Sequence, residues 1–334
     1  MEGSPPSVPP AHGGNLTRAT ALFGAPADGW LDLSTGINPV PYADLTLSRD
    51  SLTRLPSEEV LDELLVAVRL AYGIPDGAGL CAAPGTQALI ELLPAFRQDA
   101  RVGIMSPTYG EHGHVWRRAG HEVSEIDRLE MAGDYEIVVV TNPNNPDGRI
   151  CEPARLAGLS DALAESGGWL IVDEAFADVT PAISLAPLAG RPGLILLRSF
   201  GKFFGLAGLR LGFAAGPTDL ISAFETRLGP WAVSGPAMEI GTRALRDSMW
   251  IETTRAVLAA RRARLDTALQ AAGFSVMGGT DLFRLTAHDH APAFYAHLGR
   301  SGILVRNFPE HPNWLRFGLP GSEADFLRLE KALG

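Results

Sequence analysis

The sequence predicts an α/β fold in which helices flank a mostly parallel sheet and a smaller α+β domain follows. Short apolar runs rich in β-branched residues recur along the chain, and segments of helical length separate them. Strands that alternate with helices imply crossover connections, and therefore parallel strands. The chain also has 334 residues, more than the roughly 250–300 at which a single core stops growing. Two unequal domains are therefore expected.

Five runs are expected to form buried strands of the sheet: residues 101–105, 135–140, 169–172, 194–198 and 211–214. Helical segments are expected over residues 86–96, 111–119, 152–166 and 219–227. Residues 238–272 are rich in Ala, Arg and Leu and contain no proline. This composition predicts one long helix that leads out of the sheet domain.

The predicted domain organisation has four parts. Residues 1–11 are a proline-rich leader, expected to be extended or disordered. Residues 12–45 form an N-terminal segment that contributes to the small domain and to an active-site lid. Residues 46–250 form the large sheet domain, and residues 251–334 form the small C-terminal domain. In the small domain, strands are expected over residues 274–277, 282–285, 303–305 and 314–317, with a helix over 292–300.

Composition excludes several classes of function. The net charge of −10 and the pI near 5.3 argue against nucleic acid or an anionic membrane as the main partner, because the protein's field would repel both. Cys81 and Cys151 are the only cysteines, and no Cys/His cluster has zinc-ligand spacing, so neither a disulfide framework nor a metal site is expected. The sequence shows no signal peptide and no apolar run that could span a bilayer. A cytoplasmic protein is expected.

Polar residues that follow the strand runs are expected to meet at one edge of the sheet, where open parallel sheets bind ligands. The run 135–140 leads into Thr-Asn-Pro-Asn-Asn-Pro-Asp-Gly at residues 141–148, which by itself is also typical of a solvent loop. The run 169–172 ends at Asp173 and Glu174. An acidic pair at a strand end is, taken alone, more often a helix cap.

The segment after the run 194–198 contains the most informative residue, Lys202. Phe200, Phe203 and Phe204 surround it in the sequence, which predicts a partly desolvated amine with a lowered pKa that can serve as a nucleophile. Ser199 and Arg210 flank the lysine as candidate phosphate donors. The alternative for a lone lysine is a side chain that extends from the loop into solvent. A nucleotide P-loop is excluded, because no glycine precedes Gly201-Lys202 at the required spacing.

Together, Asn145, Asp173 and the array Ser199, Lys202 and Arg210 resemble the aspartate aminotransferase fold family. These are enzymes of fold type I that depend on pyridoxal 5'-phosphate (PLP), and the Asn-Pro-Asn-Asn-Pro-Asp-Gly motif is similar to the histidinol-phosphate aminotransferase branch. The resemblance implies that Lys202 holds the cofactor as a Schiff base and that Asp173 keeps its pyridine nitrogen protonated. It also implies that Asn145 donates to the phenolic oxygen, and that residues 46–250 are the PLP-binding domain.

The same resemblance assigns the remaining cofactor contacts. Ser199 and Arg210 would bind the cofactor phosphate, together with Gly85, Thr86 and Gln87, which open a helix whose N–H groups suit an anion. Tyr109 would stack on the pyridine ring. One residue departs from the branch, because Phe176 follows Asp-Glu-Ala where these aminotransferases usually have tyrosine. Phenylalanine cannot donate a hydrogen bond, which weakens the aminotransferase interpretation.

Two N-terminal motifs point to a reaction. His-Gly-Gly-Asn at residues 12–15 and Leu-Asp-Leu-Ser-Thr-Gly-Ile-Asn-Pro at 31–39 resemble the threonine-phosphate decarboxylases of cobalamin biosynthesis. The resemblance implies decarboxylation of L-threonine O-3-phosphate to (R)-1-amino-2-propanol O-2-phosphate and CO2. A Gly-Gly pair beside histidine and asparagine suits an anion-binding lid, although a flexible leader is the alternative. The candidate substrate-binding residues are His12, Gly13, Gly14, Asn15, Gly36, Ile37, Asn145, Arg306 and Arg316.

Arg306 and Arg316 each follow an apolar run and resemble the substrate clamps of the branch. Because guanidinium groups bind phosphate and carboxylate bidentately, we assign Arg306 with His12 to the substrate phosphate and Arg316 with Asn145 to its carboxylate. Solvated arginines at strand ends are the alternative.

The resemblance also implies a homodimer, although the tyrosine that a partner chain usually supplies is not evident in Thr-Arg-Leu-Pro at residues 53–56. A histidinol-phosphate-type aminotransferase that uses 2-oxoglutarate and glutamate remains the alternative enzyme. A non-catalytic regulator built on the same fold is disfavoured, because the sequence has no basic patch or DNA-binding appendage.

Overall fold

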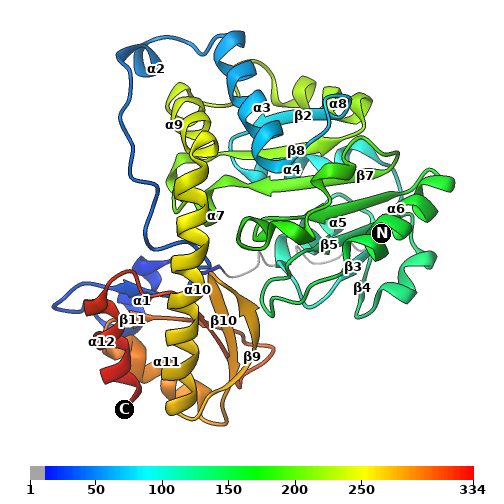
Figure 1. Cartoon of the computed structure of the whole chain (residues 1–334). Coiled ribbons are helices and arrows are strands. Elements are labelled where there is room, and N and C mark those ends of the chain that lie inside the picture. Colours follow the sequence, from blue (N-terminus) through cyan, green and yellow to red (C-terminus); the bar gives the residue numbers. More distant parts are fainter. Residues whose placement is uncertain (1–11) are drawn as a thin grey trace.

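The computed structural model describes residues 12–334, so the predicted leader, residues 1–11, lies outside the described residues. A seven-stranded sheet forms the centre of the large domain, in the order β2-β8-β7-β6-β5-β3-β4 (Figure 1). Within this sheet, β8 runs in the direction opposite to all the other strands, which are parallel to one another. The mostly parallel sheet is as predicted. Its strands are β2 (Gly79–Ala83), β3 (Arg101–Met105), β4 (Glu122–Ile126), β5 (Ile137–Thr141), β6 (Trp169–Asp173), β7 (Leu194–Ser199) and β8 (Gly212–Gly216).

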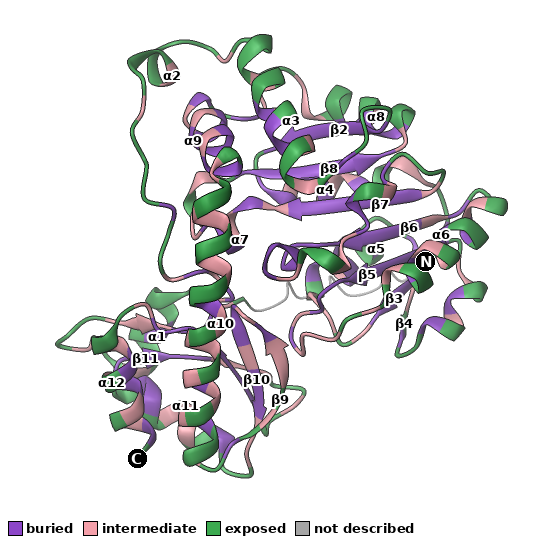
Figure 2. Cartoon of the chain, viewed as in Figure 1, coloured by how far each residue is buried: buried purple, intermediate pink, exposed green. Residues whose placement is uncertain are grey.

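Helices cover both faces of this sheet. One face contacts α4 (Thr86–Leu92), α5 (Gly110–Arg118) and α8 (Thr218–Leu228); the other contacts α3 (Glu58–Tyr72), α6 (Pro153–Glu165) and α9 (Gly235–Arg246). Side chains alternate between faces along each strand, so Ile137 and Val139 join one core cluster while Val138 and Val140 join the other. The strands are accordingly buried between helices whose outer faces are exposed (Figure 2).

The small domain contains a four-stranded antiparallel sheet in the order β12-β13-β10-β9. The N-terminal segment joins this domain, because β1 (Leu31–Asp32) pairs in parallel with β11 (Ile303–Leu304). Helix α1 (Leu16–Phe23) lies against α11. The other elements are β9 (Ser275–Thr280), β10 (Phe283–Ala287), β12 (Arg306–Asn307), β13 (Trp314–Gly318), α11 (Ala291–Arg300) and α12 (Glu323–Leu333).

The prediction of one helix over residues 238–272 is wrong, because the chain forms two helices there, α9 and α10 (Ser248–Ala271). Asp247 separates them: its backbone leaves the helical region, and its side chain accepts a hydrogen bond from the Trp250 amide at 3.0 Å, which caps α10. Helix α10 then passes from the large domain into the small domain (Figure 1). The predicted domain boundary at residue 250 falls in its first turn.

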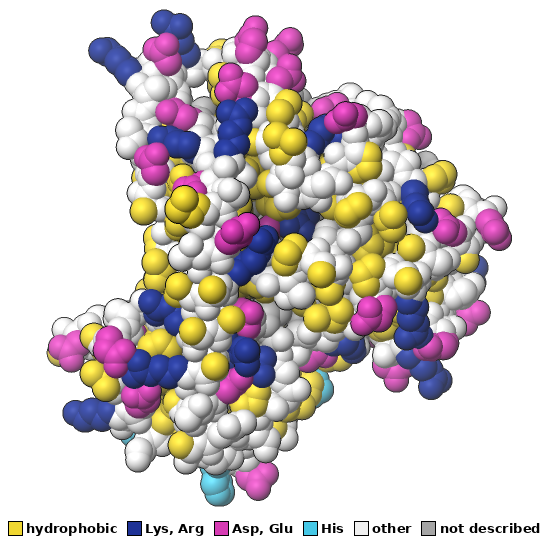
Figure 3. Space-filling view, in the orientation of Figure 1, with side chains coloured by type: hydrophobic (Ala, Val, Ile, Leu, Met, Phe, Trp, Pro, Cys, Tyr) yellow, Lys and Arg dark blue, Asp and Glu magenta, His cyan; other side chains and the backbone are white. Residues whose placement is uncertain are grey.

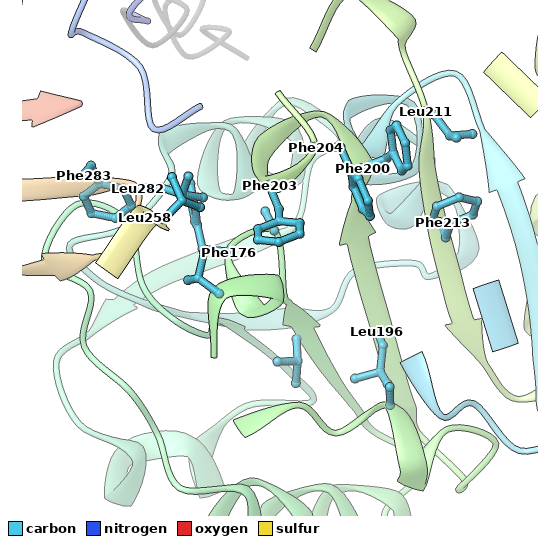
Figure 4. Close-up of a cluster of buried hydrophobic side chains, with 14 of the residues drawn as sticks. Phe176, Leu196, Phe200, Phe203, Phe204, Leu211, Phe213, Leu258, Leu282 and Phe283 are labelled. Carbon is cyan, nitrogen blue, oxygen red and sulfur yellow. The ribbon is translucent and has the colours of Figure 1, made fainter. Parts of the chain in front are cut away.

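Short elements complete the fold: α2 (Arg49–Thr53), α7 (Phe200–Phe203), and 3-10 turns at Leu93–Phe96, Leu129–Asp134, Ala177–Val179, Pro181–Ile183, Ala186–Leu188 and Ala207–Leu209. An aromatic cluster fixes α7 in the core (Figure 4). Phe204 stacks on Phe200 with ring centroids 4.3 Å apart, and Trp250 of α10 stacks on Phe204 at 5.5 Å. The short helix that carries Lys202 is therefore anchored by burial of its own aromatic side chains.

The described part of the chain has no helix that is long and apolar enough to cross a membrane. Across residues 12–334, no group of three or more His, Cys, Asp or Glu side chains is arranged to hold a metal ion. Acidic and basic side chains are interspersed on the face shown in Figure 3, so this face has no extended patch of one charge.

Candidate active site

A cavity of about 200 Å³ opens where β5, β6 and β7 end. Asp173 is the last residue of β6 and Ser199 the last of β7, while Thr141 ends β5 opposite Asp173 in the strand register. Parallel strands bring such residues to one edge of the sheet. The structure thereby places all nine predicted cofactor residues on the lining of this cavity: Gly85, Thr86, Gln87, Tyr109, Asn145, Asp173, Ser199, Lys202 and Arg210.

Asp173 is buried and held from two sides. Its Oδ2 lies 2.9 Å from Nε2 of His112, and its Oδ1 accepts a hydrogen bond from the Ala175 amide at 3.0 Å. Sequence reasoning missed His112, which is also fully buried. The spacing offered a signal, because residues three apart share one side of a helix and His112 follows Tyr109 by three. The His112 ring and the Ala175 backbone amide together fix the carboxylate of Asp173, which lines the cavity.

Lys202 stands on α7 with an amine that is easily deprotonated. Burial lowers the pKa of Lys202 to about 8, with help from the positive charge of Arg316 and against the opposing effect of Asp173. Its backbone oxygen accepts a hydrogen bond from the Asn38 amide at 2.9 Å. Its amine lies over the ring of Phe176, with the nitrogen 5.8 Å from the ring centroid.

The lowered pKa confirms the predicted desolvation of Lys202, but the three phenylalanines that flank it in the sequence are not among the residues that line the cavity. Phe200, Phe203 and Phe204 are fully buried and pack into the core (Figure 4). Phe200 and Phe203 lie on the single turn of α7 and Phe204 follows it, so these rings join the core while Lys202 lines the cavity. Phe176 lies beside the amine, and Gly201, Ala207 and Leu211 are among the other apolar or small residues that line the same cavity.

One part of the cavity has the character of a phosphate site. The Arg210 guanidinium approaches the backbone of Gly85 so closely that a Cβ there would lie 2.6 Å from Nη2, and the φ of +88° at Gly85 is in the region that favours glycine. Arg210 itself has a positive φ of 54°, a strained conformation that proteins keep mainly at functional positions. The Thr86 hydroxyl donates to the backbone oxygen of Arg198, beside Ser199, at 3.2 Å.

These groups fit PLP. A buried carboxylate suits a protonated pyridine nitrogen, a desolvated amine suits the aldehyde, and an arginine with a serine and a helix start suits a phosphate. Tyr109 contributes an aromatic wall, and its hydroxyl donates to Oε1 of Gln87 at 3.3 Å. Asn145, the predicted donor to the phenolic oxygen of PLP, lines this cavity. Phe176 also lines it but has no hydroxyl and cannot donate.

A second cavity adjoins the first and shares Tyr109, Asn145, Phe176 and Lys202 with it. Six of the predicted substrate residues line it: His12, Gly13, Gly36, Asn145, Arg306 and Arg316. Arg316 donates to Oδ1 of Asn145 and, at 2.9 Å, to the backbone oxygen of Ser34. Burial lowers the pKa of Arg316 to about 9, with a contribution from the charge of Arg306.

Three other predicted substrate residues lie beside this cavity and not on its lining. The Asn15 side chain accepts a hydrogen bond from the Arg18 amide at 2.9 Å and caps α1. The Gly14 amide donates to the Ser34 hydroxyl at 2.7 Å. Ile37 follows Gly36 and is half-buried.

The fold and these groups define a PLP-dependent enzyme of fold type I. The chain belongs to the aminotransferase class I and II family, whose model matches residues 43–333. It is 46% identical over 325 residues to the threonine-phosphate decarboxylase of Pseudomonas aeruginosa, with 96% of each chain covered. It is 43% identical over 333 residues to that of Sinorhizobium sp, with 98% of each covered.

A solved structure shares the fold. The histidinol-phosphate aminotransferase from Sinorhizobium meliloti, solved in complex with pyridoxal-5'-phosphate, matches with a TM-score of 0.81. The match covers 95% of this chain and 93% of that one at 19% identity. At this identity the likeness concerns the fold alone.

Proposed function

We propose that this enzyme decarboxylates L-threonine O-3-phosphate to (R)-1-amino-2-propanol O-2-phosphate and CO2, a reaction of cobalamin biosynthesis. The observation that carries the proposal is the cavity with two arginines that opens onto Lys202. The similarity to two threonine-phosphate decarboxylases over nearly the whole chain supports the same substrate.

The two arginines are arranged for a substrate with two anionic groups. Arg306 and Arg316 are direct partners in the antiparallel register of β12 and β13, so their side chains leave the sheet on one face. Like charges placed opposite each other are destabilising, and burial disfavours the charged form of each. A ligand with both a phosphate and a carboxylate would offset both costs. We assign the carboxylate to Arg316 with Asn145, and the phosphate to Arg306 with His12.

PLP supplies an electron sink that weakens a bond at the substrate Cα, and the residues of this chain choose which bond breaks. Anchors at both ends of the substrate would fix its rotation, so that these residues select the Cα–carboxylate bond as the one that breaks. Asp173, positioned by His112, holds the proton on the pyridine nitrogen. Lys202 delivers a proton to Cα after CO2 leaves, and its lowered pKa suits a group that exchanges protons near neutral pH.

Product analysis tests the proposal against transamination. The PLP-loaded protein is incubated with L-threonine O-3-phosphate, with and without 2-oxoglutarate, and the products are measured by mass spectrometry. The proposal predicts one CO2 for each aminopropanol phosphate, at a rate that does not depend on the keto acid. Formation of glutamate from 2-oxoglutarate when histidinol phosphate replaces the substrate, with no decarboxylated product from L-threonine O-3-phosphate, would instead support the aminotransferase alternative.

We further propose a homodimer in the cytoplasm. Exposed leucines near α2 support an interface: Leu52 and Leu55 are 65% and 67% exposed, and apolar side chains this exposed favour a partner surface. The use of two unpaired cysteines suits a reducing compartment.

A further inference from the structure

We propose that the hydroxyl of Ser34 holds residues 12–14, here called the lid, over the substrate cavity, so that one residue positions both the lid and Arg316. The hydrogen bond from the Gly14 amide to this hydroxyl is here called the latch. Ser34 would then be a positioning residue, because it acts through the lid. The inference deepens the proposed function and relies on it for the identity of the substrate. Three sets of contacts support it.

The direction of the hydrogen bonds at Ser34 is fixed. Its side chain is buried, with 1% of the residue exposed. The hydroxyl donates to Oδ1 of Asp32 at 2.6 Å, and the Ser34 amide donates to the same oxygen at 2.9 Å. A hydroxyl has one proton and accepting lone pairs, so Ser34 Oγ is left to accept. The Gly14 amide fills that role at 2.7 Å.

The backbone of Ser34 serves the substrate clamp independently of its side chain. The Ser34 oxygen accepts a hydrogen bond from Nη2 of Arg316 at 2.9 Å. The preceding residue, Leu33, bonds to Leu304 at 2.8 Å and to Gly318 at 2.6 Å, which ties this segment to the ends of β11 and β13. Removal of the hydroxyl should therefore free the lid while leaving Arg316 in place.

The lid is shaped to lie against Ser34. A Cβ on Gly13 would collide with the Ser34 backbone oxygen, so glycine is needed for this close approach. Gly14 has a φ of +79°, in the left-handed region that favours glycine. The other end of the lid reaches the large domain, where His12 Nε2 lies 2.7 Å from Oε1 of Glu111 on α5. The lid thus spans the mouth of the cavity between Ser34 and Glu111.

Loss of the latch should weaken substrate binding with little effect on chemistry. The lid carries His12, which is assigned to the substrate phosphate, whereas Lys202 and Asp173 are positioned by other elements. One hydrogen bond of this type corresponds to about a fivefold to tenfold change in an equilibrium constant. We therefore expect Ser34→Ala to raise KM for L-threonine O-3-phosphate by about fivefold to tenfold, with kcat and PLP affinity unchanged.

The experiment compares Ser34→Ala, Gly13→Ala and the control Ser160→Ala with the parent enzyme. Gly13→Ala keeps the Ser34 hydroxyl but would push the lid away from the Ser34 backbone, so it should also raise KM. Ser160 is a buried serine on α6 whose hydroxyl has no partner among the described residues, so its loss controls for removal of a buried hydroxyl. Each PLP-loaded protein is assayed for KM, kcat and PLP affinity, and hydrogen exchange is measured in the peptide that contains residues 12–16.

Faster exchange at the lid and a raised KM in both test variants, with the control unchanged, would support the latch. Exchange and KM equal to those of the parent enzyme in Ser34→Ala would overturn it, as would an equal loss of kcat or PLP affinity. If the parent enzyme fails to turn over L-threonine O-3-phosphate, the proposed function fails, but lid exchange in Ser34→Ala still decides whether the latch exists.

Discussion

Lys202 and Lys331 are the two lysines of this sequence, and they lie in different surroundings. Lys202 lines the cavity beside Asp173, whereas Lys331 is exposed in the last turn of α12. Borohydride reduction of the holoenzyme is therefore expected to attach the cofactor to the peptide that contains Lys202. Lys202→Ala should abolish both labelling and turnover, while Lys331→Ala should leave both unchanged. Peptide mass mapping distinguishes the two sites, and label on Lys331 would contradict the assignment.

The pKa of Lys202, lowered to about 8, predicts the pH dependence of cofactor capture. Only the neutral amine attacks an aldehyde, so the rate at which the apo protein captures PLP should rise with pH and reach half its maximum near 8. Arg316→Gln removes a positive charge that favours the neutral amine, so it should move the midpoint to higher pH. Stopped-flow absorbance measures both, with the exposed Arg300→Gln as control. A midpoint above pH 10 in the parent protein would contradict a desolvated amine.

Phe176 predicts a spectroscopic difference from enzymes with a tyrosine at this position. Its ring is buried and packs edge-on against Phe283, with centroids 5.0 Å apart. Phe176→Tyr introduces a hydroxyl that can donate to the phenolic oxygen of PLP, and a donor stabilises the form in which that oxygen is charged. In Phe176→Tyr, the pH midpoint of the change in visible absorbance of the bound PLP should therefore lie about 1 to 2 units below that of the parent enzyme. Phe176→Leu, which adds no donor, should not lower it.

At the scale of elements, the sequence allowed prediction of most buried strands but of few connections between them. Runs such as residues 101–105, after its exposed first residue Arg101, and 169–172 contain no polar side chain, because both sheet faces are covered. The edge strand β4 was missed because Glu122 and Glu125 interrupt its apolar pattern. The break between α9 and α10 was missed because a single cap at Asp247 decides it.

In the candidate site, too, some residues could be predicted from the sequence and others could not. Residues at strand ends, such as Asp173 and Ser199, were predictable because the topology of a parallel sheet brings them together. His112 had only the signal of its spacing from Tyr109, and Ser34 had none, because the roles of both depend on contacts with residues far away in the sequence. Ser34 meets Arg316 only because β1 pairs with β11, and local patterns do not encode such a pairing.

A buried charge network behind the site predicts a stability effect. Arg198, on β7, bonds to Glu174 at 2.8 Å and to Asp178 at 2.7 Å, and all three side chains are buried. Arg198→Met would remove the cation that bonds to both buried carboxylates, which should lower the free energy of unfolding by about 3 to 5 kcal/mol. Arg191→Met, which breaks an exposed pair with Asp161, should change it by less than about 1 kcal/mol. Chemical denaturation of both variants tests this, and equal effects would contradict it.

At the scale of the whole molecule, the proposed homodimer predicts a particle of twice the 35.5-kDa chain mass. In Figure 1, α2 lies at the end of a long extended connection from the small domain, and Leu52 and Leu55 beside it are exposed. Leu55→Glu should shift the protein toward the monomer in sedimentation velocity. Leu327→Glu, at a leucine that is 57% exposed on α12, should leave the dimer intact. A parent protein that sediments as a monomer would contradict the proposal.

The most direct test of the whole account is to identify the Cα bond that breaks, by running the reaction with L-threonine O-3-phosphate in D2O without keto acid. Decarboxylation replaces the carboxylate with one solvent hydrogen and retains the original Cα–H. The account therefore predicts aminopropanol phosphate with one deuterium on the carbon that bears the amine. Substrate that exchanges its Cα hydrogen for deuterium and keeps its carboxylate would contradict it.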